Sequence, residues 1–148
     1  KVAVQLAGKT QEATADADLA RVTVPALVMV GANDQTTPGD PNVTRAWELT
    51  GSSPHIRVEL VAGQHQTFTD LCDYQEFLPT LADVPQVVTD TITAFGEEGC
   101  SPGDMPIDRA KELTNSFAVQ FLESVFRDGP AIDPVTVFPD DVVVMIKP

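Results

Sequence analysis

Residues 22–34, VTVPALVMVGAND, contain the stretch that decides the fold of this chain. Residues 25–30 are apolar without alternation, which is typical of a strand covered on both faces, as in a parallel sheet between helices. The run stops at Gly31, and a carboxylate follows at Asp34. In open parallel sheets the functional loops lie at the carboxyl ends of the strands, so Asp34 is a candidate functional acid.

The rest of the chain alternates in the same way. Periodicity and turn residues predict strands at 2–8, 24–30 and 56–61, and helices at 43–50, 68–81, 84–95 and 106–128. The intervening segments 9–20 and 36–42 read as loops, and 135–138 and 142–146 read as extended segments that form either a terminal hairpin or a tail. Strands that alternate with helices predict an α/β fold in a single domain over residues 1–148.

Composition excludes several classes of partner. The chain has 148 residues, of which 43% are hydrophobic, and its 22 acids against 9 Lys and Arg give a formal charge of -13. Such a charge repels phosphate backbones, so nucleic acid is not an expected partner. No apolar run is long enough for a membrane span. The chain begins at Lys1 and continues at once into apolar residues, which favours a chain processed or cut from a longer one.

Cysteine is present only at positions 72 and 100. An even pair in an acidic chain poor in lysine favours a disulfide between Cys72 and Cys100, with two free buried thiols as the alternative. A bond would tie the predicted helix that follows His65 to the loop before the last long helix.

Asp34 and His65 follow neighbouring predicted strands after a glycine-containing turn, GAND in one case and GQH in the other. If the strands pair, the carboxylate can accept a hydrogen bond from one imidazole nitrogen and leave the other free to take a proton from a nucleophile. Each residue also has a simpler interpretation, since Asp34 can close a turn or cap a helix and His65 can be a polar loop residue. His55 precedes its strand, and we expect it to be a loop residue that faces solvent.

The stretches VPALVMVGANDQTTP and VELVAGQHQTFTDLC, with the tail from Cys100 into the last long helix, resemble the α/β-hydrolases. Within that family the resemblance is to secreted or periplasmic esterases, the predicted dienelactone hydrolases and platelet-activating-factor acetylhydrolase-like enzymes. It implies a serine-dependent carboxylic ester hydrolase that acts on a small ester or lipid-like substrate without a cofactor. The family's chain order is Ser, acid, His, so the resemblance implies that Asp34 is the triad acid and His65 the general base.

No serine of this sequence is placed as the nucleophile that this family needs. Residues 99–103, GCSPG, match the form Gly-x-Ser-x-Gly, but Pro102 has no backbone N–H to offer an oxyanion hole, and Ser101 comes after His65. The other serines, Ser52, Ser53, Ser116 and Ser124, have no glycines placed for a sharp turn. We therefore expect this chain to correspond to the carboxyl-terminal half of the fold. The nucleophile would then lie on a missing or separate amino-terminal part.

The sequence raises two alternatives to a hydrolase. Asp34, Asp40, Asp70 and Asp73 lie near His65 in sequence and could suggest a metal site, but residues 34–39 do not fit the calcium-loop pattern and no zinc motif is present. No metal is therefore expected. The other alternative is a binding or assembly domain that keeps the scaffold without catalysis.

Overall fold

The computed structural model describes residues 1–8, 14–132 and 140–148, and its centre is a mixed sheet. The strand order is β1-β2-β3-β4, in which the first three strands are parallel and β4 runs antiparallel to β3. The strands are β1 (Ala3–Leu6), β2 (Ala26–Gly31), β3 (His55–Leu60) and β4 (Val142–Lys147). The predicted α/β class with a largely parallel sheet is confirmed.

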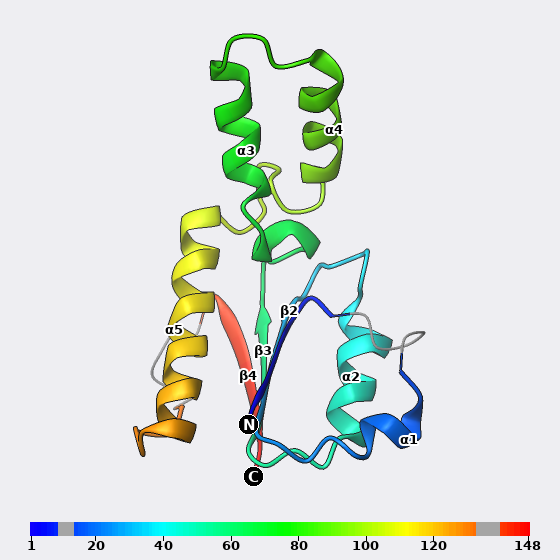
Figure 1. Ribbon diagram of the computed structural model, residues 1–148, viewed down its shortest axis with the longest axis vertical. Helices are drawn as coiled ribbons and strands as arrows, with labels where there is room; N and C mark the ends of the chain where they lie inside the picture. The colour runs from blue at the N-terminus through cyan, green and yellow to red at the C-terminus, as the bar shows by residue number, and fades with distance from the viewer. Residues whose placement is uncertain (9–13, 133–139) are drawn as a thin grey trace.

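Helices cover both faces of this sheet (Figure 1). On one side lie α1 (Asp16–Leu19) and α2 (Gly39–Leu49), and on the other lies α5 (Ile107–Phe126). Beyond the carboxyl ends of the parallel strands, α3 (Leu71–Phe77) and α4 (Gln86–Gly96) form a helical hairpin that projects from the body. Two short 3-10 turns, η1 (His65–Phe68) and η2 (Leu78–Thr80), flank α3. In the described ranges, no helix combines the length and apolar character that crossing a membrane requires.

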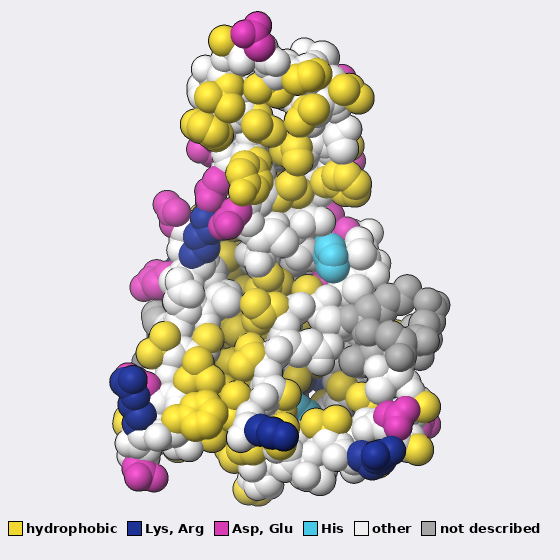
Figure 2. Space-filling model, in the orientation of Figure 1, with side chains coloured by type: hydrophobic (Ala, Val, Ile, Leu, Met, Phe, Trp, Pro, Cys, Tyr) yellow, Lys and Arg dark blue, Asp and Glu magenta, His cyan; other side chains and the backbone are white. Residues whose placement is uncertain are grey.

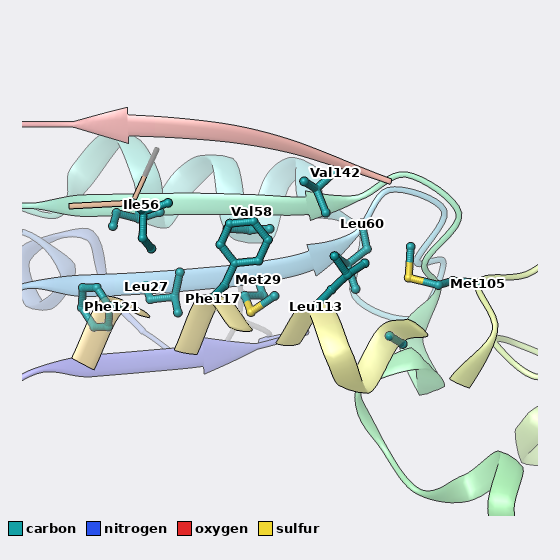
Figure 3. Close-up of a cluster of buried hydrophobic side chains, with 12 residues drawn as sticks. Leu27, Met29, Ile56, Val58, Leu60, Met105, Leu113, Phe117, Phe121 and Val142 are labelled. Carbon is teal, nitrogen blue, oxygen red and sulfur yellow. The ribbon is translucent and has the colours of Figure 1, made fainter. Parts of the chain in front are cut away.

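The uninterrupted apolar run of β2 follows from its central position. Leu27 and Met29 belong to the cluster between the sheet and α5, which Figure 3 shows with Phe117 and Phe121 of that helix. Val28 and Val30 point the other way and pack with Val43 of α2. Because both faces of β2 are buried, no position on it tolerates the polar residue that a half-exposed strand carries.

Several boundaries differ from the sequence prediction. The predicted helix 68–81 is divided into η1, α3 and η2, because Thr69 is extended and Pro79 cannot continue the helical hydrogen bonding of α3. Of the predicted loop 9–20, residues 9–13 lie outside the described residues and residues 16–19 form α1. Arg45 holds the first residue of α1 by a 2.9 Å hydrogen bond from Nε to Asp16 Oδ1. The helix predicted at 43–50 begins earlier, at Gly39. The boundaries predicted for 84–95 and 106–128 agree closely with α4 and α5.

The C-terminal segment 142–146 is extended as predicted, and it forms the sheet strand β4 on β3. Segment 135–138, the other part of the predicted hairpin or tail, lies outside the described residues. The Lys147 ammonium at the end of β4 donates to the carbonyl oxygens of Trp47 and Thr50, at 3.3 and 3.2 Å. These contacts fix the end of β4 beside α2.

The prediction that His55 is a loop residue facing solvent is wrong. It is the first residue of β3, and its exposed fraction is 1%. Its ring lies against Trp47, with centroids 4.6 Å apart, and its Nδ1 is 3.1 Å from the Thr50 hydroxyl. Burial, followed by the nearby charge of Lys147, lowers the pKa of His55 from 6.5 to about 4.

Substituting Phe117 tests the core between the sheet and α5. Phe117→Ala removes a fully buried ring and leaves a cavity, so we expect a loss of about 3 to 5 kcal/mol in the free energy of unfolding. Phe126→Ala on the same helix is the control, because that ring is exposed and its loss should cost less than about 1 kcal/mol. Urea denaturation measures both, and equal losses would contradict the assignment of the core.

The buried His55 makes stability depend on pH. Since its pKa is lower in the folded chain, the unfolded chain takes up the proton first, and stability present above pH 6.5 is lost as the pH falls toward about 4. The loss at this residue is on the order of 3 kcal/mol. His55→Asn should flatten the pH dependence of the urea midpoint over this range. An unchanged slope in the variant would show that His55 does not titrate as a buried group.

Candidate functional site

Two glycines allow the loops after β2 and β3 to meet. A Cβ placed at Gly31 would lie 2.5 Å from the carbonyl carbon of Gly63, so a side chain there would collide with backbone. The two loops are joined by hydrogen bonds from the N–H of Ala32 to the oxygen of Leu60 and from the N–H of Asn33 to the oxygen of Gly63, both 2.9 Å. The residues that follow each strand are therefore brought to the same point at the edge of the sheet.

Asp34 follows β2 in a turn closed by its own N–H on the oxygen of Gly31, and its side chain is fully buried. Oδ1 accepts a 2.6 Å hydrogen bond from the backbone N–H of Thr37, and Oδ2 lies 2.8 Å from the Thr37 hydroxyl. The turn-closing interpretation of Asp34 is therefore correct. It is compatible with a second role, because Oδ2 also faces the imidazole of His65.

His65 begins η1, immediately after the loop that follows β3. Its Nδ1 lies 3.1 Å from Asp34 Oδ2 and 3.1 Å from the Thr37 hydroxyl oxygen. An ionised carboxylate only accepts hydrogen bonds, so Nδ1 donates to Asp34 and the lone pair of a neutral ring lies on Nε2. The His65 side chain is 25% exposed. The expected contact between acid and imidazole is present, and it leaves Nε2 to handle protons.

Thr37 is a member of this cluster that the sequence analysis did not identify. Its single hydroxyl proton is shared between Asp34 Oδ2, at 2.8 Å, and the carbonyl oxygen of Ala7, just past β1, at 3.0 Å, while the hydroxyl oxygen faces His65 Nδ1. Thr37 therefore joins the ends of three strands. An acid followed by threonine three residues later is a common local capping pattern, and that pattern was the available signal.

Glu98 is a second residue that the sequence analysis missed. It connects the loop after β2 with the η1 turn that begins at His65. Its Oε1 accepts hydrogen bonds from the backbone N–H of Gln35 at 2.5 Å and of Thr36 at 2.9 Å, and its Oε2 accepts one from the Thr36 hydroxyl at 2.6 Å. Its own carbonyl oxygen accepts the N–H of Gln66, at 3.0 Å, next to His65. No local pattern connects Glu98 to residues so far back in the chain.

The pKa of Glu98 reflects this environment. Its partial burial works to raise the pKa, but the hydrogen bonds from Thr36 and Gln35, with the nearby His65, outweigh burial and hold the pKa below its usual range. The carboxylate is therefore ionised at neutral pH and presents a negative charge close to the imidazole.

Cys72 and Cys100 form a disulfide, with a distance of 5.4 Å between their Cα atoms. The prediction of a bridge is confirmed. Cys100 is close to Glu98 in sequence, and its own N–H donates to the oxygen of Gly96. The bond therefore fixes the segment that carries Glu98 against the start of α3, a short distance along the chain from His65.

The remaining candidate residues do not join the site. Ser101 is exposed, and its hydroxyl donates to the carbonyl oxygen of Glu97. The side-chain hydrogen-bond partners of His65 in the described part of the chain are Asp34 and Thr37, so no serine is among them. Asp70 and Asp73 pair with Lys111, and Asp40 is exposed. Within the described residues, no three His, Cys, Asp or Glu side chains are grouped to hold a metal ion.

Comparison with known proteins found no match among family models, curated proteins or solved structures. The geometry of the Asp34, Thr37 and His65 cluster and the loops around it is therefore the basis for a functional conclusion.

The role of Glu98 in holding the loop after β2 can be tested without any assay of activity. Glu98→Ala removes a charged acceptor from the N–H groups of Gln35 and Thr36, and a hydrogen bond to a charged group contributes about 1.5 to 3 kcal/mol. We therefore expect amide hydrogen exchange at these positions to accelerate by about 10-fold or more. Glu97→Ala, which alters the neighbouring acid, is the matched control. Exchange that is equally slow in both variants would show that Glu98 does not hold the loop.

Proposed function

We propose that this chain is the acid- and base-bearing part of a serine-dependent carboxylic ester hydrolase. The observation that carries the proposal is the 3.1 Å contact between Asp34 Oδ2 and His65 Nδ1 at the carboxyl ends of two adjacent parallel strands. A buried carboxylate that fixes the tautomer of a partly exposed imidazole is the arrangement a general base needs.

The chemistry assigned to each residue follows from the hydrogen bonds. His65 Nε2 would take the proton of a serine hydroxyl as that oxygen attacks the ester carbonyl carbon, and would return the proton to the leaving alcohol. Asp34 would stabilise the imidazolium formed in between, and Thr37 would hold the carboxylate through its N–H and hydroxyl. His65 would then activate a water molecule as general base, and that water would hydrolyse the acyl-enzyme.

The nucleophile is assigned to a separate or missing amino-terminal part of the same hydrolase. That part would carry the serine and the oxyanion hole. The edge strand β1 supports this assignment, because it pairs with β2 alone in the described sheet and its Val4 and Leu6 are exposed. An unpaired strand edge is suited to receive another parallel strand. With that addition the chain would form the carboxyl-terminal half of an α/β-hydrolase fold.

The substrate class proposed is a small ester or lipid-like ester, by resemblance to the dienelactone hydrolase and platelet-activating-factor acetylhydrolase-like esterases. A secreted or periplasmic location fits the Cys72–Cys100 bridge, since such bonds persist in oxidising compartments.

A second candidate is a binding or assembly domain on the same scaffold. It is favoured by one observation, which is that the described partners of His65 include no serine. On this alternative the Asp34 to His65 contact is a structural link between two loops.

Labelling with a fluorophosphonate distinguishes the two candidates in protein isolated from its natural source. The hydrolase proposal expects the label on a second polypeptide that co-purifies with this chain, or on an amino-terminal extension of it, at a serine. Label at Ser101 would contradict the assignment, and absence of label would favour the binding domain.

In the unlabelled complex of this chain with the part that carries the identified serine, Asp34→Asn should lower kcat by about 10⁴-fold, because an amide favours the wrong imidazole tautomer. Asp108→Asn is the control, since that side chain is exposed in the first turn of α5 and should leave kcat close to the wild-type value. Near-normal turnover in Asp34→Asn would reject Asp34 as the triad acid.

A further inference from the structure

The α3–α4 hairpin, residues 71–96, lacks a core of its own. None of the residues of α3 is buried, and α4 buries only Gly96. Two helices that fully bury no apolar side chain gain little stability from packing, and short isolated helices are marginal in water. The hairpin must therefore be held by other interactions, or be completed by something that covers it.

Polar contacts and a covalent bond hold the hairpin in place. The Cys72–Cys100 disulfide closes its base, and the amide of Gln75 donates to the carbonyl oxygens of Ile92 and Thr93, at 3.3 and 3.1 Å, to join the two helices. Lys111 of α5 pairs with Asp70 at 3.1 Å and with Asp73. These contacts supplement a small apolar contribution, since Leu71 and Ile92 are only half-buried.

Other apolar side chains of the hairpin are presented to solvent. Figure 2 shows apolar atoms gathered across α3 and α4 on the viewed face of the projecting hairpin. Phe77 is 53% exposed and Phe95 60%. The exposed large apolar residues of the hairpin and its connection are Tyr74, Phe77, Leu81, Val87, Val88 and Phe95. A grouped apolar surface of this kind, framed by charged residues, marks an interaction site more often than a chance exposure.

The charges on this surface all have one sign. No Lys or Arg occurs between Arg57 and Arg109, whereas Asp73, Glu76, Asp83 and Asp90 lie on the hairpin, and Lys111 of α5 pairs with Asp73 alone among these four. A partner that covers the apolar residues therefore meets these acidic side chains, which we call the acidic rim. A second copy of this chain, with a formal charge of -13, would bring the same rim and be repelled. An anionic lipid surface would be repelled for the same reason.

We propose that the α3–α4 hairpin is a docking surface for a basic amphipathic helix of a partner protein. The apolar face of such a helix would cover Tyr74, Phe77 and Phe95, and its Lys and Arg side chains would meet the acidic rim. Amphipathic helices with apolar side chains at every third or fourth position bind apolar surfaces in this way. The proposal does not depend on the hydrolase activity, since it concerns a surface outside the Asp34, Thr37 and His65 cluster.

The probe for this surface is a fluorescein-labelled helical peptide of leucine and lysine, with the leucines on one face. We expect it to bind the chain in fluorescence anisotropy, more weakly at high salt because the rim charges are screened. The double variant Phe77→Ser with Phe95→Ser should weaken binding by about 10-fold or more, since exposed aromatic anchors contribute much of such binding energy.

The matched control is Val119→Ser with Phe126→Ser on α5, because these residues are 53% and 60% exposed, as Phe77 and Phe95 are. This control should bind the peptide as the wild-type chain does. A peptide with glutamate in place of lysine should fail to bind.

Equal affinity of the peptide for both double variants, or equal binding of the glutamate peptide, would overturn the proposal. Sedimentation that finds a dimer broken by the hairpin variant alone would assign the surface to a second copy. Binding of neutral phosphatidylcholine vesicles, lost in that variant while the peptide does not bind, would assign it to lipid. Either result contradicts a basic helix as the occupant.

Discussion

The arrangement of the site depends on one buried carboxylate. The Asp34 side chain is fully excluded from solvent, so its oxygens must find donors within the chain. They find them in the N–H and hydroxyl of Thr37 and in the Nδ1 of His65. Satisfying this charge draws the loops after β2 and β3 together, and the shared Thr37 hydroxyl adds the end of β1. The same requirement that closes the loops also orients the imidazole, so the local folding and the proposed chemistry have a common cause.

The arrangement also requires the backbones of the loops after β2 and β3 to approach closely, and glycine makes this possible. Gly31 and Gly63 lie against each other where the two strands end, and a Cβ at Gly31 would meet the carbonyl group of Gly63. Glu98 and the Cys72–Cys100 bridge then hold the outer side of the loops. The hairpin that begins after η1 extends away from this point and offers an apolar, acidic surface to a partner. The Asp34, Thr37 and His65 cluster and the proposed docking surface are thus adjacent along the chain but use separate side chains.

The sequence allowed the local features of the fold and the acid and imidazole pair to be predicted. The apolar run of β2 and the regular spacing of α5 were sufficient, because burial on two faces and burial on one stripe leave different patterns. The interior position of His55 was not predictable, since its burial comes from Trp47 and from β4, which approach only in the folded chain. Glu98 was missed for a similar reason, since its role arises from contacts with distant loops, whereas the link between Thr37 and Asp34 is local and its capping pattern was overlooked.

The most direct test of the central claim is the tautomer of His65, read from the ¹⁵N and ¹H NMR signals of its imidazole at a pH where the ring is neutral. We expect a proton on Nδ1, shifted downfield by its hydrogen bond to Asp34, and a lone pair on Nε2. A neutral ring that carries its proton on Nε2, or an Nδ1 signal unaffected by Asp34→Asn, would contradict it.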